Sequence, residues 1–360
     1  MSHPADPGRA EADDAELEAL RQCLSIGDAA AGLTSPNPPV GAVVLDASGR
    51  VVGGGATQPP GGPHAEVVAL IQSGTSAVGG TLVSSLEPCA HHGRTGPCTD
   101  VIAAAGITRV VFGAADPNPI AAGGAAALRS RGIDVVEDQL PDEIRRSAVG
   151  RWLAATEFGR PHVTWKYACT LDGRVAAADG SSRWITSEPA RADVHRLRAG
   201  LDAVLVGSGT VLTDDPQLTV RDEAGKLALR QPTRFVFDRR GRVPANALVR
   251  DTCAPTTVWD GDLRAGLSAL YDMGARAVLL EGGPTLAAAF LRADCVDRVV
   301  GYLAPALLGA GPTVVGDLEI PDIGQALRLD MEDVTLIGTD VRVTAVLRAA
   351  RPAQPAAAGH

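Results

Sequence analysis

Four residues of the first half have types and spacing that could hold and use a metal ion. His64 and Glu66 lie one residue apart after the turn-forming residues 59–63, and eight residues separate Cys89 from Cys98. One imidazole and two thiolates make a three-ligand zinc site with an open position for water, whose pKa zinc lowers to about 7. Glu66 need not bind the metal, because its carboxylate can carry a proton from that water to a leaving amine. The set predicts zinc-dependent hydrolysis of a ring amine.

Two alternatives remain open for these residues. A structural zinc site would use His91 or His92 as a fourth ligand, and a chain without metal would leave His64 as a surface residue. The His-x-Glu spacing, combined with a proline directly before Cys89, favours the catalytic site because this combination is the signature of zinc deaminases.

Two strand-to-turn junctions of the second half could approach phosphate groups. The apolar run 277–280 ends at Glu281, and residues 282–285 (Gly-Gly-Pro-Thr) follow it. Proline suits the first turn of a helix, and the free N–H groups of a helix start can bind a pyrophosphate. The other junction, at 204–210, lacks the third glycine of the dinucleotide-binding fingerprint, so a plain turn into a helix is the simpler interpretation.

Arginines gather in the second half. Arg191 and Arg196, on an expected helix, fit a solvated surface, whereas Arg198 and Arg221 flank the turn region and suit bidentate binding of a phosphate. The full group is Arg183, Arg191, Arg196, Arg198, Arg221, Arg239 and Arg240.

Apolar runs alternate with helical patterns between aperiodic termini, which predicts α/β layers in two domains. Glycine and proline at 159 and 161 form a stop signal, so we place the domains at 15–158 and 159–350. We expect a three-layer first domain with helices on both faces of one sheet. Its predicted strands are 40–45, 51–53, 81–84, 109–112 and 133–136, and its predicted helices are 17–31, 64–73, 98–105, 123–131 and 141–157. In the second domain we expect strands at 162–168, 204–206, 234–237, 256–259, 277–280 and 296–303, helices at 263–273 and 285–291, and a closing pair of strands around 334–347.

Composition and charge exclude several classes of partner. The net charge of −9 is concentrated in residues 1–158, which carry −8, and only 3% of all residues are aromatic. An acidic, aromatic-poor chain lacks the basic field and stacking surfaces that bind nucleic acid. No apolar run is long enough to span a membrane, and the acidic N-terminus is unlike a secretory signal, so we expect a cytoplasmic protein. Cys23, Cys169, Cys253 and Cys295 lie among apolar residues and are expected in the core.

The first half resembles the deaminase half of the bifunctional riboflavin-biosynthesis RibD family. The similarity lies in the eight-residue gap between the cysteines and in residues 35–41, 64–67, 86–95 and 116–119. The resemblance implies a cytidine-deaminase-like fold and hydrolytic deamination of a diamino-hydroxy-pyrimidine with a phosphoribosylamino group. It further implies that Asn37 and His92 contact the base and that Arg94 reaches toward the ribose phosphate.

The second half resembles the reductase half of the same family at residues 166–174, 182–186, 210–216, 218–221 and 281–286. The resemblance implies a dihydrofolate-reductase-like α/β fold that uses NADPH to reduce the ribosyl group to ribityl. It places substrate near Lys166, Ser182, Arg198, Leu218, Arg221 and Glu281. It places the cofactor near Ala168, Trp184, Thr210, Asp214, Gly283, Pro284, Thr285, Leu286, Ala287, Ala288 and Ala289.

One position departs from the family pattern. Relatives often have a small polar residue after the strand that ends at Asp238, and this chain has Arg239, which could pair with the 2′-phosphate of NADP. Lys166 is expected to orient the sugar. The partners that we expect are small phosphoribosyl-pyrimidines and further copies of the chain in a dimer or tetramer.

Two other classes of function are less consistent with the chain. A nucleic-acid-editing deaminase would need a basic, aromatic face, and the first half is acidic. A non-catalytic binding protein with a degenerate deaminase fold would have lost Glu66 or a ligand, and none of the four residues is lost.

Overall fold

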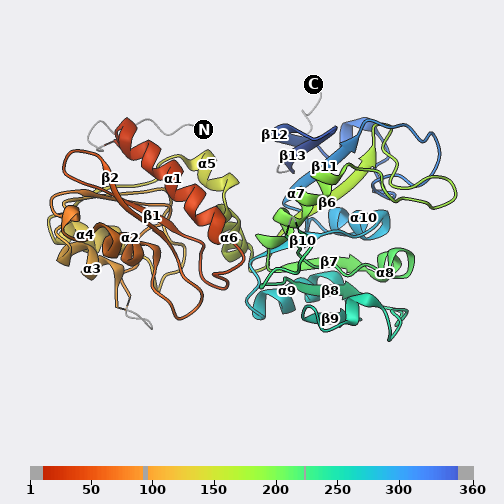
Figure 1. Ribbon diagram of the computed structural model, residues 1–360, viewed down its shortest axis with the longest axis horizontal. Coiled ribbons are helices and arrows are strands. Elements are labelled where there is room, and N and C mark those ends of the chain that lie inside the picture. Colours follow the sequence, from red (N-terminus) through yellow and green to blue (C-terminus); the bar gives the residue numbers. More distant parts are fainter. Residues whose placement is uncertain (1–10, 92–95, 223, 348–360) are drawn as a thin grey trace, which may run out of the picture.

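The computed structural model describes residues 11–91, 96–222 and 224–347. Within them, two sheets occupy different halves of the molecule, and the chain passes once from one half to the other between Phe158 and His162 (Figure 1). The same residues contain no helix that is long and apolar enough to cross a membrane.

The described part of the N-terminal half contains a five-stranded sheet in the order β2-β1-β3-β4-β5. β1 is antiparallel to β2 and β3, whereas β3, β4 and β5 are mutually parallel neighbours. Parallel strands need crossover helices, which cover the sheet. The strands are β1 (Gly41–Leu45), β2 (Val51–Ala56), β3 (Thr81–Ser84), β4 (Arg109–Phe112) and β5 (Asp134–Val136).

Alternating residues of these strands build two apolar layers. Val43, Val83 and Val111 pack with α1 on one face, and their neighbours Val44 and Leu82 pack with the helices of the other face. The half is therefore a three-layer sandwich. Its helices are α1 (Asp14–Ala30), α2 (Ala65–Ser73), α3 (Cys98–Ala104), α4 (Gly124–Ser130), α5 (Pro141–Arg146) and α6 (Ala148–Phe158), with a short 3₁₀ turn η1 (Gly74–Ala77).

The prediction of a single helix over 141–157 was wrong. Two helices, α5 and α6, meet at Ser147, whose backbone is extended, with φ −80° and ψ 175°. The Ser147 hydroxyl donates to the carbonyl of Ile144 at 2.6 Å and accepts from the N–H of Gly150 at 3.3 Å. Serine thus ends one helix and caps the next, a local competition with the backbone that a hydrophobic pattern does not reveal.

The C-terminal half contains, in its described residues, an eight-stranded sheet in the order β12-β13-β11-β6-β10-β7-β8-β9. The six strands from β11 to β9 are parallel, and β13 and β12 add an antiparallel edge. Their bounds are β6 (His162–Thr170), β7 (Ala203–Gly207), β8 (Thr233–Phe237), β9 (Thr256–Trp259), β10 (Ala277–Leu280), β11 (Arg298–Ala304), β12 (Leu329–Ile337) and β13 (Asp340–Leu347).

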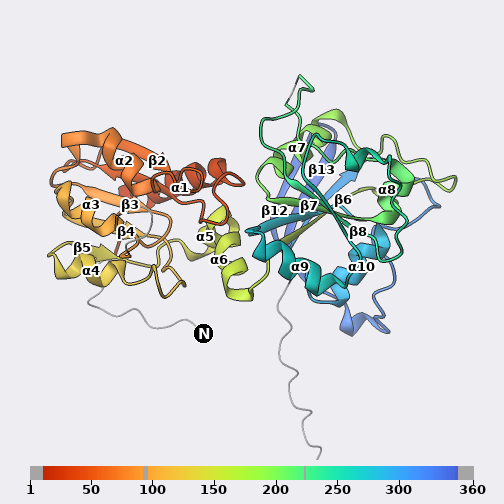
Figure 2. The same cartoon turned by 90° about the horizontal axis from the view of Figure 1, so that it is seen from below.

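Helices cover both faces of this sheet (Figure 2). Leu267 of α9 and Phe290 of α10 pack on one face, where Phe290 meets Phe237 edge-on with ring centroids 5.7 Å apart. On the other face, Ala190 of α7 packs with Tyr302 of β11. The helices are α7 (Glu188–Ala199), α8 (Ser208–Asp214), α9 (Leu263–Asp272) and α10 (Pro284–Arg292), with 3₁₀ turns η2 (Leu248–Arg250) and η3 (Ile323–Gln325).

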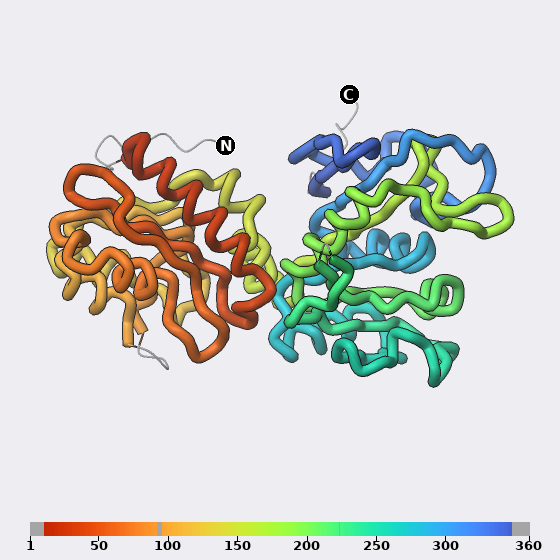
Figure 3. The backbone as a smooth tube through the Cα atoms, viewed as in Figure 1, coloured from red at the N-terminus to blue at the C-terminus, as the bar shows by residue number. Residues whose placement is uncertain are grey.

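The backbones of the two halves lie side by side where the chain crosses between them (Figure 3), and polar contacts join the halves there. Asp202, before β7, accepts from the hydroxyl of Ser35 at 2.9 Å and from the N–H groups of Arg276 and Ala277. Arg298 of β11 donates to the carbonyl of Arg146 at 3.1 Å. The Asp202 carboxylate, whose side chain is 9% exposed, therefore ties a loop of the first half to two strands of the second.

Candidate active sites

Three side chains of the N-terminal half converge to form a potential metal site. His64 caps α2, Cys98 begins α3, and Cys89 lies in the loop after β3. The His64 Nδ1 atom is 3.5 Å from the Cys89 Sγ atom and 3.3 Å from the Cys98 Sγ atom. Tetrahedral zinc with ordinary Zn–N and Zn–S bonds separates such ligands by about 3.5 Å. The ligand atoms, all within 4.8 Å of one another, therefore fit one zinc ion.

The local hydrogen bonds favour the thiolate form of a ligand. Contacts with Cys98, and then with the His64 ring, hold the pKa of the Cys89 thiol well below its usual range. The N–H of Cys98 also points at the Cys89 sulfur, at 3.5 Å. A thiolate is the form that binds metal.

Glu66 lies beside this cluster in the first turn of α2 and is 4% exposed. Burial raises the pKa of its carboxyl group above the ordinary value. A carboxyl group whose pKa is raised holds its proton more readily than an exposed one, which suits a general acid–base group.

Two residues without a predicted role hold Cys89 in place. The buried Glu87 carboxylate accepts from the N–H of Ala125 at 2.9 Å and from that of Asp116 at 3.2 Å. A Cβ at Gly124 would collide with the carbonyl oxygen of Pro88. The only sequence signals for this packing were a glutamate within an apolar stretch and the glycine pair at 123–124.

The expected base-binding residues are only partly described. Asn37 is half-buried in the turn before β1, where its N–H donates to the carbonyl of Thr34 at 2.9 Å. His92 and Arg94 lie outside the described residues. His91, half-buried between Cys89 and that segment, has a buried Nδ1 atom without a hydrogen-bond partner among the described residues.

In the C-terminal half, the register of β6 and β10 brings two predicted substrate residues together. Leu280, the last residue of β10, pairs with Trp165, so Glu281 directly after β10 lies beside Lys166 in the middle of β6. The Lys166 Nζ atom is 2.9 Å from the Glu281 carboxylate. Arg198, at the end of α7, meets the same carboxylate with two nitrogens, at 2.5 and 3.0 Å.

Glu281 is thus a charged group held in the interior. Its side chain is 6% exposed, and those of Lys166 and Arg198 are 16% and 15% exposed. Although burial raises the pKa of Glu281, the Arg198 and Lys166 cations outweigh it and hold that pKa well below the usual range. Arg198 therefore faces a carboxylate, where a phosphate was predicted.

The predicted cofactor residues lie mainly where helices α8 and α10 begin. β7 and β10 are parallel neighbours, so both helices start at the same sheet edge. A Cβ at Gly283 would lie 3.9 Å from the Thr210 hydroxyl, which shows how close the two turns are. Pro284, Thr285, Leu286 and Ala289 are at least partly exposed at the start of α10, but Ala287 and Ala288 are buried in the core.

A loop from the end of β6 approaches the same edge. Arg183 donates to the carbonyl of Asp214 at 2.5 Å, which places the neighbouring Ser182 and Trp184 beside α8. Trp184 is 69% exposed and stacks on Arg191, whose guanidinium carbon is 4.5 Å from the ring centroid. Ala168 is half-buried on β6.

The remaining predicted residues lie on two loops. Leu218 is 5% exposed and packs in the core, so its backbone is what a substrate could reach. Arg221 follows it and is half-buried. Arg239 is exposed after β8, in a turn whose Arg242 donates to the Ser208 hydroxyl at the start of α8 at 2.8 Å.

Comparisons with known proteins agree with both sites. Residues 14–114 match the cytidine and deoxycytidylate deaminase zinc-binding region, and residues 161–343 match the RibD C-terminal domain. The riboflavin biosynthesis protein RibD of Mycobacterium tuberculosis is 47% identical over 88% of this chain and 93% of its own length. The chain belongs to the RibD family.

More distant relatives, some of known structure, also match over most of their length. RibD of Escherichia coli is 38% identical over 89% of this chain and 96% of its own length. The crystal structure of the diaminohydroxyphosphoribosylaminopyrimidine deaminase/5-amino-6-(5-phosphoribosylamino)uracil reductase of Thermotoga maritima has a TM-score of 0.84 and 33% identity, covering 93% of this chain and 99% of that chain. RibD of Acinetobacter baumannii has a TM-score of 0.81 and 34% identity over the same shares.

The predicted fold class and the predicted class of enzyme are confirmed. This RibD-family chain joins a cytidine-deaminase-like domain to a reductase domain and is a bifunctional deaminase and reductase of riboflavin biosynthesis. Zinc and NADPH are its cofactors. Its partners are small molecules.

Substituting Gly124 by alanine should weaken zinc binding, because the new Cβ displaces the Pro88 carbonyl next to the ligand Cys89. Loss of support around a ligand typically lowers metal affinity about 10-fold or more. Competition with a chromogenic chelator measures this affinity. The matched control is Gly200→Ala, where the added Cβ would meet its nearest neighbours at 3.8 Å. Unchanged zinc affinity in Gly124→Ala would show that this packing does not support the site.

Proposed function

We propose that residues 15–158 deaminate 2,5-diamino-6-(5-phosphoribosylamino)pyrimidin-4-one, and that residues 159–350 then reduce the ribosyl group of 5-amino-6-(5-phosphoribosylamino)uracil to ribityl. The observation on which the proposal rests most is the buried carboxyl group of Glu66 beside the His64, Cys89 and Cys98 cluster. The name of the Thermotoga maritima relative supports the choice of substrates. The last residues of the second range, 348–350, lie outside the described part of the chain.

In the deaminase domain, His64, Cys89 and Cys98 hold the metal and Glu66 moves the proton. Zinc bound by these three ligands would supply an activated water near neutral pH. Glu66 accepts the proton of that water and delivers it to the amine that leaves the ring. Asn37, His92 and Arg94 are assigned to the substrate by family resemblance, the first two to the base and Arg94 to the phosphate.

In the reductase domain, the carboxylate of Glu281 holds the Lys166 ammonium in one position. The Lys166 ammonium then has N–H groups with which to orient the hydroxyls of the sugar. Arg198 keeps Glu281 ionised and fixed. NADPH supplies the hydride. We assign Ser182, Leu218 and Arg221 to the substrate.

We assign the cofactor to the edge formed by the starts of α8 and α10. The backbone N–H groups of Gly283, Thr285 and Leu286 lie at the start of a helix of nine residues and suit a pyrophosphate. We assign to the same cofactor Ala168, Trp184, Thr210 and Asp214, together with the residues from Thr285 to Ala289. Arg239 is assigned to the 2′-phosphate.

We also propose that two copies of the chain associate through the free edge of β12 and act in the cytoplasm. β12 is the end strand of its sheet and exposes Met331, Val334 and Leu336 by 55%, 62% and 73%. An exposed apolar edge strand is a common site of self-association. All six cysteines are free thiols, which suits a reducing compartment.

Glu66→Gln should retain zinc and lose deamination by at least about 100-fold, because glutamine keeps the shape of the side chain but cannot carry the proton. Release of ammonia and zinc content are measured on the same preparation. Reduction, catalysed by the other domain, should be unchanged, and the exposed Glu157→Gln serves as the matched control. Near-normal ammonia release from Glu66→Gln would rule out this role.

Glu281→Gln should lower kcat/KM for reduction at least about 10-fold, because it leaves two cations without their carboxylate. Breaking a buried ion pair also costs about 3–5 kcal/mol of folding free energy. Oxidation of NADPH at 340 nm measures reduction, and urea unfolding measures stability. Ammonia release by the deaminase domain is the internal control. If reduction is as fast as in the wild type, the charge of Glu281 has no part in it.

The wild-type chain should sediment as a dimer, and Leu336→Lys should shift it toward the monomer, because a lysine at the interface would be buried without a partner. Analytical ultracentrifugation at micromolar concentrations distinguishes the two masses. Leu229→Lys, at a fully exposed leucine outside β12, is the control. A monomeric wild type, or a dimeric Leu336→Lys variant, would contradict the proposed interface.

A further inference from the structure

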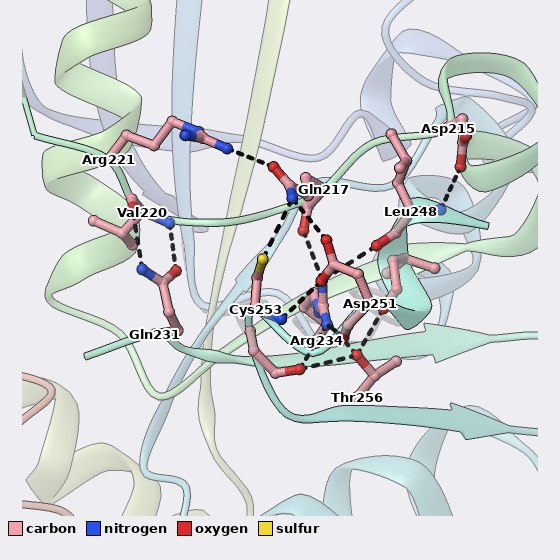
Figure 4. Close-up of polar contacts among 12 residues, drawn as sticks. Asp215, Gln217, Val220, Arg221, Gln231, Arg234, Leu248, Asp251, Cys253 and Thr256 are labelled. Atoms are coloured by element: carbon pink, nitrogen blue, oxygen red, sulfur yellow. Dashed lines mark hydrogen bonds and ion pairs between the residues drawn. The ribbon is translucent and has the colours of Figure 1, made fainter. Parts of the chain in front are cut away.

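A network of polar contacts with a buried arginine at its base supports the loop that contains Arg221 (Figure 4). At its base is Arg234 of β8, whose side chain is 0% exposed. Its guanidinium donates to the Asp251 carboxylate at 2.8 Å and to the Thr256 hydroxyl at 2.8 Å. It also donates to four backbone carbonyls, those of Gln217, Leu248, Asp251 and Ala254. A buried guanidinium whose N–H groups all have acceptors is fixed in one position, so Arg234 forms a rigid anchor for the network.

Asp251 extends this anchor toward the loop. One carboxylate oxygen accepts from Arg234 and from the N–H of Cys253, and the other accepts from the side-chain amide of Gln217 at 2.6 Å. Hydrogen bonds from Gln217, and then from Arg234, hold the pKa of Asp251 well below its usual range. Asp251 is therefore a carboxylate that only accepts hydrogen bonds.

Gln217 links Asp251 to Arg221, because its side-chain amide donates to Asp251 and presents an oxygen acceptor to Arg221. Its amide nitrogen must face Asp251, so its oxygen is left for Arg221, whose guanidinium donates to it at 2.5 Å. Because a carboxylate only accepts and a guanidinium only donates, a single orientation of the amide satisfies both neighbours. Glutamate or an apolar residue could not make both contacts.

Three further contacts hold the loop in the same conformation. Gln231 pairs with both backbone groups of Val220, at 2.7 and 2.9 Å. Arg198, the partner of Glu281, donates to the carbonyl of Thr219 at 3.1 Å. Leu218 has a φ of 53°, a strained conformation for a residue other than glycine that persists only where the surroundings enforce it.

Hydrogen bonds hold the Arg221 guanidinium in place but do not use all of its N–H groups. Besides Gln217 it donates to the carbonyl of Gly225 at 2.8 Å. A guanidinium has five N–H groups, so three of them lack an acceptor among the described residues. A guanidinium fixed on one side and open on the other suits bidentate binding of a phosphate.

We propose that Gln217 is a positioning residue of the reductase, which transmits the rigidity of the Arg234–Asp251 pair to Arg221 and so fixes the guanidinium that binds the substrate's phosphate. This inference rests on the proposed function, in which Arg221 contacts a phosphoribosyl substrate. Gln217 touches neither substrate nor cofactor. It acts through Arg221 alone.

The test compares 5-amino-6-(5-phosphoribosylamino)uracil with the same compound lacking the phosphate. Gln217→Met has a similar volume but makes neither hydrogen bond. We expect it to raise KM for the phosphorylated substrate about 10-fold with little change in kcat, the signature of lost ground-state binding. KM for the dephosphorylated compound should not change, which a general loss of structure could not produce. Ammonia release and KM for NADPH should stay as in the wild type.

Two controls separate this inference from the proposed function. Gln325→Met makes the same change at an exposed position and should have no effect. Arg221→Met should abolish the preference for the phosphorylated substrate, and the double variant Gln217→Met/Arg221→Met should be no worse than Arg221→Met alone. If Arg221→Met leaves the preference intact, the assignment of Arg221 fails and the inference fails with it. If only Gln217→Met leaves it intact, the inference alone is overturned.

Moving the negative charge from residue 251 to residue 217 should restore binding of the phosphorylated substrate. Gln217→Glu places a second carboxylate against Asp251 and should impair binding of the phosphorylated substrate. Adding Asp251→Asn supplies an amide that donates to the new carboxylate while its oxygen still accepts from Arg234. The double variant should therefore recover most of the affinity. Failure of Gln217→Glu/Asp251→Asn to improve on Gln217→Glu would overturn the inference.

Discussion

The parallel pairing of β10 with both β6 and β7 determines where the chemistry of the reductase domain can be. The register of these parallel pairs places Glu281, directly after β10, beside Lys166 of β6 and near the start of α8 after β7. The N–H of Glu281 even extends the ladder to the carbonyl of Leu205 at 2.9 Å. A charged cluster and two helix starts thus meet at one edge of the sheet, which is where ligands of α/β proteins generally bind.

Both domains bury a carboxyl group at the centre of the site, with opposite electrostatic results. Glu66 is desolvated, and burial raises its pKa, which suits a group that must gain and lose a proton. Glu281 is equally buried, but two cations within 3.0 Å keep it ionised. The surroundings of a carboxyl group therefore decide whether it transfers protons or acts as a fixed charge.

The sequence predicts those parts of the sites in which the residue types allow only a few kinds of chemistry. Histidine, two cysteines and a glutamate at this spacing leave few interpretations, and the structure brings the three ligand atoms together. Most strands were predicted to within one or two residues because each is a short apolar run between turn residues. The break at Ser147 was missed because a hydroxyl competes there with the helical backbone.

Contacts between distant residues could not be predicted. Arg198 was expected at a phosphate, but 83 residues separate it from Glu281, and no local pattern shows that strand register and α7 bring them together. Gln217 lies between a proline and a leucine, and it gains a role only through Asp251, which is 34 residues away. Such pairs form only when helices and strands pack together, and no short stretch of a single sequence shows that packing.

The two domains also differ in what makes their ligand-binding groups rigid. His64 and Cys98 stand at the starts of helices, so regular backbone hydrogen bonds fix their positions. The loop from Gln217 to Arg221 belongs to no helix or strand, and apart from a short bridge between residues 220–221 and 227–228 its backbone is held by side chains. Arg234 and Gln231 provide those contacts from β8 and the residues before it. An irregular segment lacks the regular backbone hydrogen bonds of a helix or strand, so it can bind a ligand with defined geometry only where buried polar groups replace them. This requirement accounts for the fully buried Arg234 beneath the loop.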